Sequence, residues 1–256
     1  MGRHGEGYHN AAESYFGTPA WNCYWSELDG NGTVTWADAK LTEVGVQQAL
    51  RVNKFWANLI KDGKISPPET YYTSPLYRCL DTARLTFTGL DLPRKSPFVP
   101  VVKEFLREGI SAHTCDRRSS KSSIRQNFPG FKFEKGFAEE DPYWTELYAE
   151  PRDNQDARSK AVVDDIFTND DSTHISISSH SGEIASLLRG KSLHSFYALR
   201  GNRLMVSHSP RSSCLQSQHR CRDSCPCQGD YVEWRCASDY DVAVYAAKDV
   251  CGAADN

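Results

Sequence analysis

The stretch THISISSHSGEIASLL, residues 173–188, joins a strand pattern to a helix pattern across a histidine. Its first seven residues alternate between polar and apolar side chains, which is typical of a β-strand. A helix is expected to open after His180 and to run to about Leu188. Ligands of α/β proteins bind beyond the carboxyl ends of parallel strands. His180 therefore occupies a position where a functional side chain is expected, although a histidine of the core or a helix cap would fit the same pattern.

Strand and helix patterns also alternate in the rest of the chain. Helices are expected over residues 41–60, 76–87 and 156–167, and strands over residues 69–74 and 97–105. This order predicts an α/β fold, with three layers in the order α/β/α and a mainly parallel central sheet.

The sequence also predicts the character of three further segments. Pro100 suggests that the strand over residues 97–105 is irregular or lies at an edge of the sheet, because proline cannot donate a ladder hydrogen bond. The polar segment 107–133 is expected to be a long functional loop. Residues 239–247 alternate well enough to form a closing strand.

The bulk composition is that of an ordinary globular protein, with 39% hydrophobic and 25% charged residues in a chain of 256. One domain over residues 1–256 is expected, since single domains reach roughly 250 to 300 residues. The 30 basic and 33 acidic residues are mixed along the chain, so nucleic acid is not an expected partner. No apolar run approaches the roughly 20 residues of a membrane span, and a secretory signal is not recognised. A cytoplasmic protein without a membrane partner is expected.

Six of the nine cysteines lie in the C-terminal part, and residues 201–236 form an irregular, Cys-rich segment. The cysteines of that segment do not match the common paired Cys-x-x-Cys spacing of zinc sites. No metal is therefore expected there.

Two other motifs place cations beside a possible anion site. Arg3-His4-Gly5 puts a guanidinium next to an imidazole, and the glycines around it allow a ligand to approach the backbone closely. Ser74-Pro75-Leu76-Tyr77-Arg78 leads from a strand end into a helix whose first turn carries Arg78. Helix N-termini favour anions, so Arg78 would reinforce an oxyanion site. Taken alone, each motif could equally be a solvated surface.

The order of these three elements resembles that of the histidine phosphatase superfamily, also called phosphoglycerate mutase-like. The runs RHGEGYHN, LTEVGVQQA and LREGISAHTCDRRS resemble the fungal phosphomutase-like branch in particular. The resemblance covers about residues 1–200 and implies the phosphoglycerate mutase-like α/β fold. It also implies that the chain is an enzyme that acts on a small phosphorylated substrate without a metal or other cofactor.

The resemblance implies a role for each candidate residue. His4 would attack phosphorus and form a phosphohistidine, while Arg3, Arg78 and His180 would surround the phosphoryl oxygens. Asn10 could donate a hydrogen bond to the same phosphate.

A general acid would protonate the leaving oxygen. In the family that the chain resembles, this acid is often a Glu or Asp after the third strand, so the segment LRE indicates Glu108, and Glu104 is the second choice. Arg117 and Arg118 could bind a carboxylate or a second phosphate on the substrate. An ion-paired surface loop would explain both arginines equally well.

The sequence departs from the family pattern at its start, where only Met1 and Gly2 precede Arg3. The apolar strand that normally leads to the nucleophile is therefore expected to be missing. A phosphatase that hydrolyses a phosphate ester of a small molecule is the preferred function. A phosphomutase of the phosphoglycerate mutase type and a non-catalytic interaction domain remain as alternatives.

Overall fold

The computed structural model describes residues 1–189. The Cys-rich segment 201–236 and the predicted strand over residues 239–247 lie outside these residues, so both stay predictions, as does the single domain over the whole chain. Within residues 1–189, no helix combines the length and the apolar character that a membrane crossing requires.

The described residues form a five-stranded parallel sheet in the order β1-β5-β2-β3-β4. The bounds of its strands are β1 Gly2–Arg3, β2 Thr70–Thr73, β3 Val101–Val102, β4 Lys132–Phe133 and β5 Ile175–Ser179. The helices are α1 Tyr8–Phe16, α2 Thr18–Cys23, α3 Glu43–Lys61, α4 Tyr77–Phe87, α5 Lys121–Asn127, α6 Arg152–Asn169 and α7 Ser181–Arg189. The predicted α/β class with a parallel sheet is thus confirmed.

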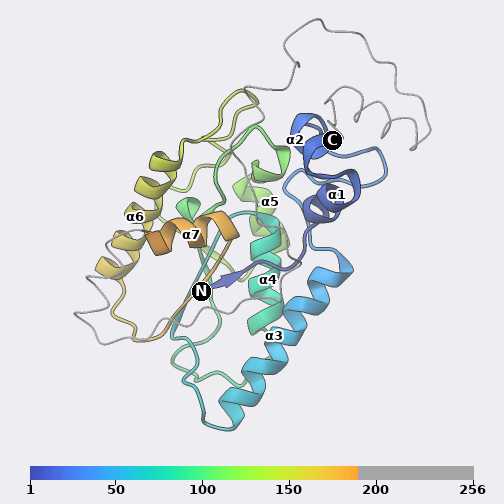
Figure 1. The fold of residues 1–256 in the computed structure, drawn as a ribbon. Helices are drawn as coiled ribbons and strands as arrows, with labels where there is room; N and C mark the ends of the chain where they lie inside the picture. Colours follow the sequence, from blue (N-terminus) through green and yellow to red (C-terminus); the bar gives the residue numbers. More distant parts are fainter. Residues whose placement is uncertain (190–256) are drawn as a thin grey trace, which may run out of the picture.

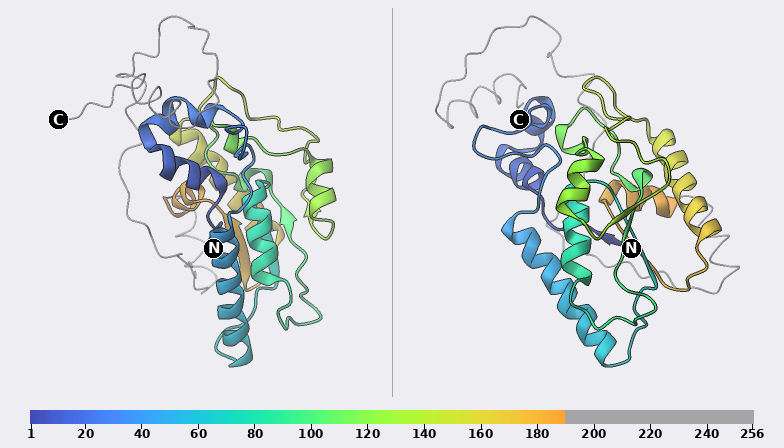
Figure 2. Two further views of the ribbon diagram at one scale, coloured as in Figure 1. Left: turned by 90° about the vertical axis from the view of Figure 1, so that its right-hand side faces the viewer. Right: turned by 180° about the vertical axis from the view of Figure 1, so that it is seen from behind.

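Helices cover the sheet on two sides, which gives the expected three layers (Figure 1). Helices α6 and α7 pack over one face with a core of Leu106, Val162, Val163, Ile166, Ile177 and Leu187. Helices α4 and α5 pack over the other face, together with α3 (Figure 2), and bury Leu80, Val102, Ile124, Phe128, Phe131 and Phe137. Apolar side chains on both faces explain why the short strands of this sheet are held in place.

Helices α1 and α2 form a smaller aromatic cluster at one end of the molecule (Figure 1). Phe16 stacks on Trp25 with ring centroids 4.1 Å apart, and the indole N–H of the fully buried Trp36 donates to the Trp25 carbonyl. Such pairs bury a large apolar area, and the indole N–H of Trp36 is satisfied within the cluster. This cluster anchors the segment that directly follows the Arg-His-Gly motif.

The first strand, which was expected to be missing, is present as Gly2–Arg3. Gly2 and Arg3 pair with Ser178 and Ser179 of β5, and the N–H of His4 continues the ladder by donating to the Ser179 carbonyl at 3.0 Å. Two residues are enough to fix the backbone that leads into His4.

Two other expectations need correction. The strand predicted over residues 97–105 is only Val101–Val102, and it is internal, because it pairs with β2 and β4. Pro100 is tolerated because it precedes the strand and contributes only its carbonyl, which accepts from Lys132 N–H. The segment 107–133 is not a single loop, since it contains α5 and β4.

Candidate active site

The nucleophile candidate His4 lies just beyond β1 and is 5% exposed. Its Nδ1 lies 2.6 Å from the Gly5 carbonyl oxygen. A carbonyl can only accept, so Nδ1 carries the hydrogen and Nε2 keeps its lone pair. A Cβ on Gly5 would come within 2.5 Å of the Gly45 carbonyl oxygen, so the loop that presents His4 requires glycine there.

His180 follows β5, the neighbour of β1, and is fully buried. Its ring centroid lies 5.0 Å from that of His4, at an interplanar angle of 60°. Ser74, at the end of the adjacent β2, contacts His180 Nε2 through its hydroxyl at 2.7 Å. Three neighbouring parallel strands therefore carry this group of side chains at their carboxyl ends, as expected for an α/β site.

Arg78 lies in the first turn of α4 and is 1% exposed. Its Nη1 donates to the Cys115 carbonyl at 2.6 Å, and its Nη2 lies 3.4 Å from Asp116 Oδ1. Its Nε–H is buried and has no hydrogen-bond partner among residues 1–189. A fixed guanidinium with an unpaired donor is suited to bind an anion.

The charges around this site act on both histidines. Burial lowers the pKa of His4 well below its ordinary value of 6.5, and the positive charges of Arg78 and Arg3 lower it further. Burial and Arg78 also lower the pKa of His180. Both rings are therefore neutral near pH 7, and the His4 Nε2 lone pair is free for attack on an electrophile.

Glu108 is tied to the beginning of α7, next to His180. Its carboxylate accepts from the N–H groups of Gly182, at 3.1 Å, and Gly109, at 3.0 Å. Burial raises the pKa of Glu108, the negative charge of Asp116 raises it further, and the two hydrogen bonds oppose the shift. A carboxyl group that keeps its proton to higher pH is suited to act as a general acid.

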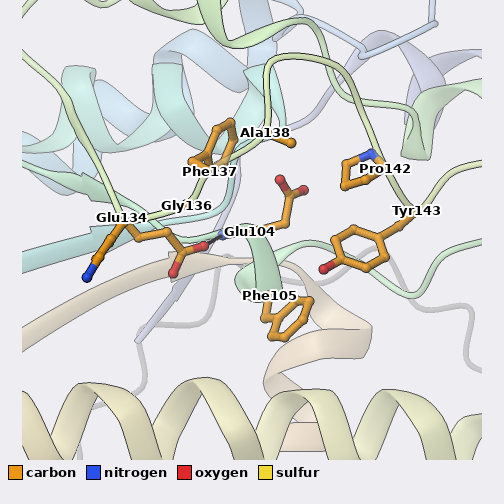
Figure 3. A pocket seen from close by; sticks show the side chains of 9 residues that line it. Glu104, Phe105, Glu134, Gly136, Phe137, Ala138, Pro142 and Tyr143 are labelled. Carbon is orange, nitrogen blue, oxygen red and sulfur yellow. Dashed lines mark hydrogen bonds between the residues drawn. The ribbon is translucent and has the colours of Figure 1, made fainter.

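Glu104 has different surroundings from Glu108. Its carboxylate is ion-paired with the buried guanidinium groups of Arg107 and Arg118. It points into a cavity of about 250 Å³ (Figure 3), whose lining is Glu104, Phe105, Glu134, Lys135, Gly136, Phe137, Ala138, Pro142 and Tyr143. His4, Arg78 and His180 do not line this cavity. The geometry therefore favours Glu108 over Glu104 as the acid.

The structure does not bring the two loop arginines together at His4. Arg118 is buried, and besides Glu104 it donates to four backbone carbonyls, those of residues 119, 138, 139 and 140. Arg117 is partly exposed, pairs with Asp29 at 2.6 Å and lies over the Trp144 ring at 4.8 Å. Arg118 is thus fully engaged by the protein, whereas the Arg117 guanidinium stays near solvent.

The remaining predicted residues belong to the N-terminal segment. Arg3 is exposed at the end of β1. Asn10 caps α1, because its Oδ1 accepts from Gly7 N–H at 3.1 Å. The Asn10 amide oxygen is therefore used in local structure, which leaves only its NH₂ group for the predicted contact with phosphate.

Two residues of the site lacked a role in the sequence interpretation. His9 has its ring centroid 5.6 Å from that of His4, and Ser74 contacts His180 as described above. Both lie in the RHGEGYHN and Ser74-Pro75-Leu76-Tyr77-Arg78 motifs. A single histidine near a glycine-rich motif and a serine beside a proline give no signal of their own, because only the fold shows what they contact.

One group of potential metal ligands lies beside Arg78. One ligand atom each of His113, Cys115 and Asp116 lies within 4.8 Å of the others. Asp116 is already paired with Arg78, and burial raises the pKa of the Cys115 thiol well above its ordinary value. Because metals bind the thiolate and are repelled by a nearby guanidinium, this group does not fit a metal ion.

Comparison with known proteins identifies the family of this chain. Residues 25–208 match the model of the histidine phosphatase superfamily (branch 1), a range that contains Arg78, Glu108 and His180 and begins after His4. The chain is 52% identical over 188 residues to a protein of Arthroderma benhamiae named "Probable phosphoglycerate mutase", covering 73% of this chain and 56% of that one. It is 40% identical over 188 residues to "Phosphomutase-like protein 3" of Candida albicans, covering 73% and 57%.

The chain thus spans a little more than half the length of these two curated relatives. A solved structure of a mycobacterial glucosyl-3-phosphoglycerate phosphatase is 21% identical, with a TM-score of 0.40 and coverage of 75% of this chain and 76% of that one. The family match and the fungal relatives confirm the resemblance seen in the sequence. This chain belongs to the histidine phosphatase superfamily, branch 1.

Proposed function

We propose that the chain is a phosphatase that hydrolyses a phosphate ester of a small molecule through a phosphohistidine at His4. The observation that carries the proposal is the hydrogen bond from His4 Nδ1 to the Gly5 carbonyl. It leaves the Nε2 lone pair free in a site where Arg78 and His180 lie close by. Arg3 belongs to the same proposed phosphoryl-binding group.

In the first step, Nε2 of His4 attacks phosphorus in line while the bond from phosphorus to the leaving oxygen breaks. Glu108 gives its proton to that oxygen, so an alcohol departs. Arg3, Arg78 and His180 stabilise the charge that spreads over the three other oxygens. In the second step, water attacks the phosphohistidine and gives a proton to Glu108, and the P–N bond breaks to release inorganic phosphate. These steps use only side chains of the protein.

The test is to trap the intermediate with a radiolabelled aryl phosphate. Phosphohistidine is stable in alkali and labile in acid, so the reaction is quenched in alkaline detergent. The parent protein is expected to carry acid-labile label, and His4→Ala is expected to carry none. The matched control is His174→Ala, because His174 is an exposed histidine. An unlabelled parent that also fails to release phosphate would overturn the proposal and favour an interaction domain.

A phosphomutase is the second candidate, because the fungal relative with 52% identity is named as a phosphoglycerate mutase. A mutase must retain its phosphorylated intermediate and return the phosphoryl group to the substrate. Isomerisation of a phosphoglycerate that requires a bisphosphate primer would support the mutase. Release of inorganic phosphate without a primer would support the phosphatase. A cytoplasmic location stays a prediction from the sequence.

A further inference from the structure

A second histidine lies beside the nucleophile, on an element other than the sheet. His9 is in the first turn of α1, and its ring centroid is 5.6 Å from that of His4, at an interplanar angle of 50°. The corresponding distance from His180 to His4 is 5.0 Å. Two imidazoles thus flank His4 at similar range, and the mechanism proposed above uses only one of them.

The position of the His9 ring depends on the absence of a side chain at Gly7. A Cβ on Gly7 would lie 2.7 Å from His9 Nδ1 and 2.8 Å from its Cε1. The Gly7 N–H donates to the Asn10 side chain, and its carbonyl accepts from Asn10 N–H at 2.9 Å. The ring therefore packs directly on a backbone segment that is itself held in place.

The Nδ1 atom of His9 is buried and has no hydrogen-bond partner in the described part of the chain. Buried polar atoms of proteins are nearly always paired, so an unpaired ring nitrogen beside the nucleophile leaves hydrogen-bonding capacity that a ligand can use. Among residues 1–189, no hydrogen bond to Nδ1 fixes which of the ring nitrogens carries the hydrogen. It can therefore adopt the tautomer that a ligand requires.

The charges that act on His9 come from the proposed phosphoryl site. Burial lowers the pKa of His9 well below 6.5, and Arg78, His4 and Arg3 lower it further, followed by His113. In the unliganded site His9 is thus neutral and offers one N–H donor. A dianionic phosphoryl group on His4 would lie in the same field of positive charge, with the rings of His9 and His180 both close to the nucleophile.

We propose that His9 is a further phosphoryl-binding residue, which donates a hydrogen bond to an oxygen of the phosphoryl group at His4. The inference rests on the proposed function for the nature of the ligand. The choice of His9 rests on the distance between the His4 and His9 rings, on the unpaired Nδ1 of His9 and on the packing of its ring against Gly7. His9 and His180 then hold the group from two separate elements, α1 and the end of β5.

The test uses orthovanadate, which adopts the five-coordinate geometry of the transition state, and inorganic phosphate as probes. Their affinities are measured by calorimetry for the parent, for His9→Ala and for the control His174→Ala. His9→Ala is expected to weaken vanadate about tenfold, the effect of losing roughly one hydrogen bond to a charged group. His9→Gln, which keeps an N–H donor, is expected to recover part of this loss. The control is expected to bind as the parent does.

A second variant displaces the ring without removing it. Gly7→Ala places a methyl group on the His9 ring, and it is expected to weaken vanadate to a similar extent as His9→Ala. Unchanged vanadate affinity in His9→Ala would overturn the inference, even if turnover of an aryl phosphate fell, because His9 would then act on the leaving group instead. Full vanadate affinity in Gly7→Ala together with a tenfold loss in His9→Ala would also contradict the role assigned to Gly7.

The vanadate measurements on His9→Ala can be distinguished from the phosphohistidine trapping that tests the proposed function. If the parent forms the phosphohistidine and His9→Ala binds vanadate normally, the inference fails and the phosphatase stands. If the parent forms no phosphohistidine and His9→Ala still weakens both anions, the phosphatase fails and the anion contact stands.

Discussion

The Oε2 atom of Glu108 accepts a hydrogen bond from the Gly182 N–H at 3.1 Å, two residues after His180. This contact joins the proposed general acid to the beginning of α7 and so to the phosphoryl site. A side chain at Gly182 would disrupt it, because a Cβ there would lie 2.3 Å from Glu108 Oε1.

Gly182→Ala is therefore expected to impair leaving-group protonation while sparing anion binding. With an alkyl phosphate, whose leaving oxygen needs a proton, kcat should fall by roughly 100-fold, the lower end of the range for general acid catalysis. With an aryl phosphate that carries a good leaving group, the loss should be much smaller. The matched control is Gly130→Ala, since a Cβ on Gly130 meets nothing within 4 Å. An equal loss on both substrates would point to damage of the phosphoryl site instead.

Glu108→Gln is expected to remove the alkaline limb of the pH profile of kcat. The acid form of Glu108 is the active one in the first step, and burial raises its pKa above 4.5. Activity of the parent should thus fall as the pH rises through the pKa of Glu108. The glutamine variant has no proton to lose there, so its residual activity, about 10²- to 10⁴-fold lower, should be flat over that range. An alkaline limb that persists in Glu108→Gln would assign the acid to another group.

Ser74→Ala is expected to lower kcat/KM by about tenfold through His180. The Ser74 hydroxyl accepts from Leu76 N–H at 3.3 Å, so its own hydrogen can point to His180 Nε2, 2.7 Å away. This arrangement favours the tautomer with the hydrogen on Nδ1 and fixes the ring plane. Without the hydroxyl the ring loses that preference, and the acidic limb of the pH profile should shift as well. Ser74→Thr keeps the hydroxyl and should restore most activity; a variant without rescue would indicate a packing defect.

The sequence indicated the candidate site residues better than it indicated the ion pairs and strand lengths of the structure around them. Arg78 and His180 could be predicted because each follows or opens an element whose pattern is visible, and carboxyl ends of parallel strands converge. No strand pattern precedes His4, so only the resemblance of Arg3-His4-Gly5 to the family motif indicated it. Arg118 could not be separated from a substrate-binding arginine, because its partner Glu104 is 14 residues away and its other partners are backbone carbonyls. The strand over residues 97–105 was overestimated because valine and aromatic residues favour strands but do not set their length.

The buried ion pairs around Arg107 predict a strong effect on stability. Arg107 is fully buried and binds both oxygens of Asp141, at 2.8 and 2.7 Å, as well as Glu104. Arg107→Met would leave Asp141 without its cation and Glu104 with Arg118 alone, and breaking a buried pair in this way costs about 3–5 kcal/mol in comparable cases. Arg84→Met removes a surface partner of Asp81 and should cost at most about 1 kcal/mol. Urea unfolding of the two variants measures both values; similar losses would show that the buried network contributes little.

Glu183 makes the stability of the protein depend on pH in a definite direction. Burial raises its pKa from 4.5 to about 7, against the charge of Arg158. The folded state thus binds the proton of Glu183 more tightly than the unfolded state does. The stability that this proton contributes is complete below about pH 4.5 and is lost as the pH rises through about 7. The pKa shift corresponds to a change of roughly 1–3 kcal/mol in the free energy of unfolding. Glu183→Gln cannot ionise, so the difference in its free energy of unfolding between about pH 5 and pH 8 should be smaller than that of the parent by this amount. A parent and a variant with equal pH dependence in urea titrations would mean that Arg158 keeps Glu183 ionised throughout.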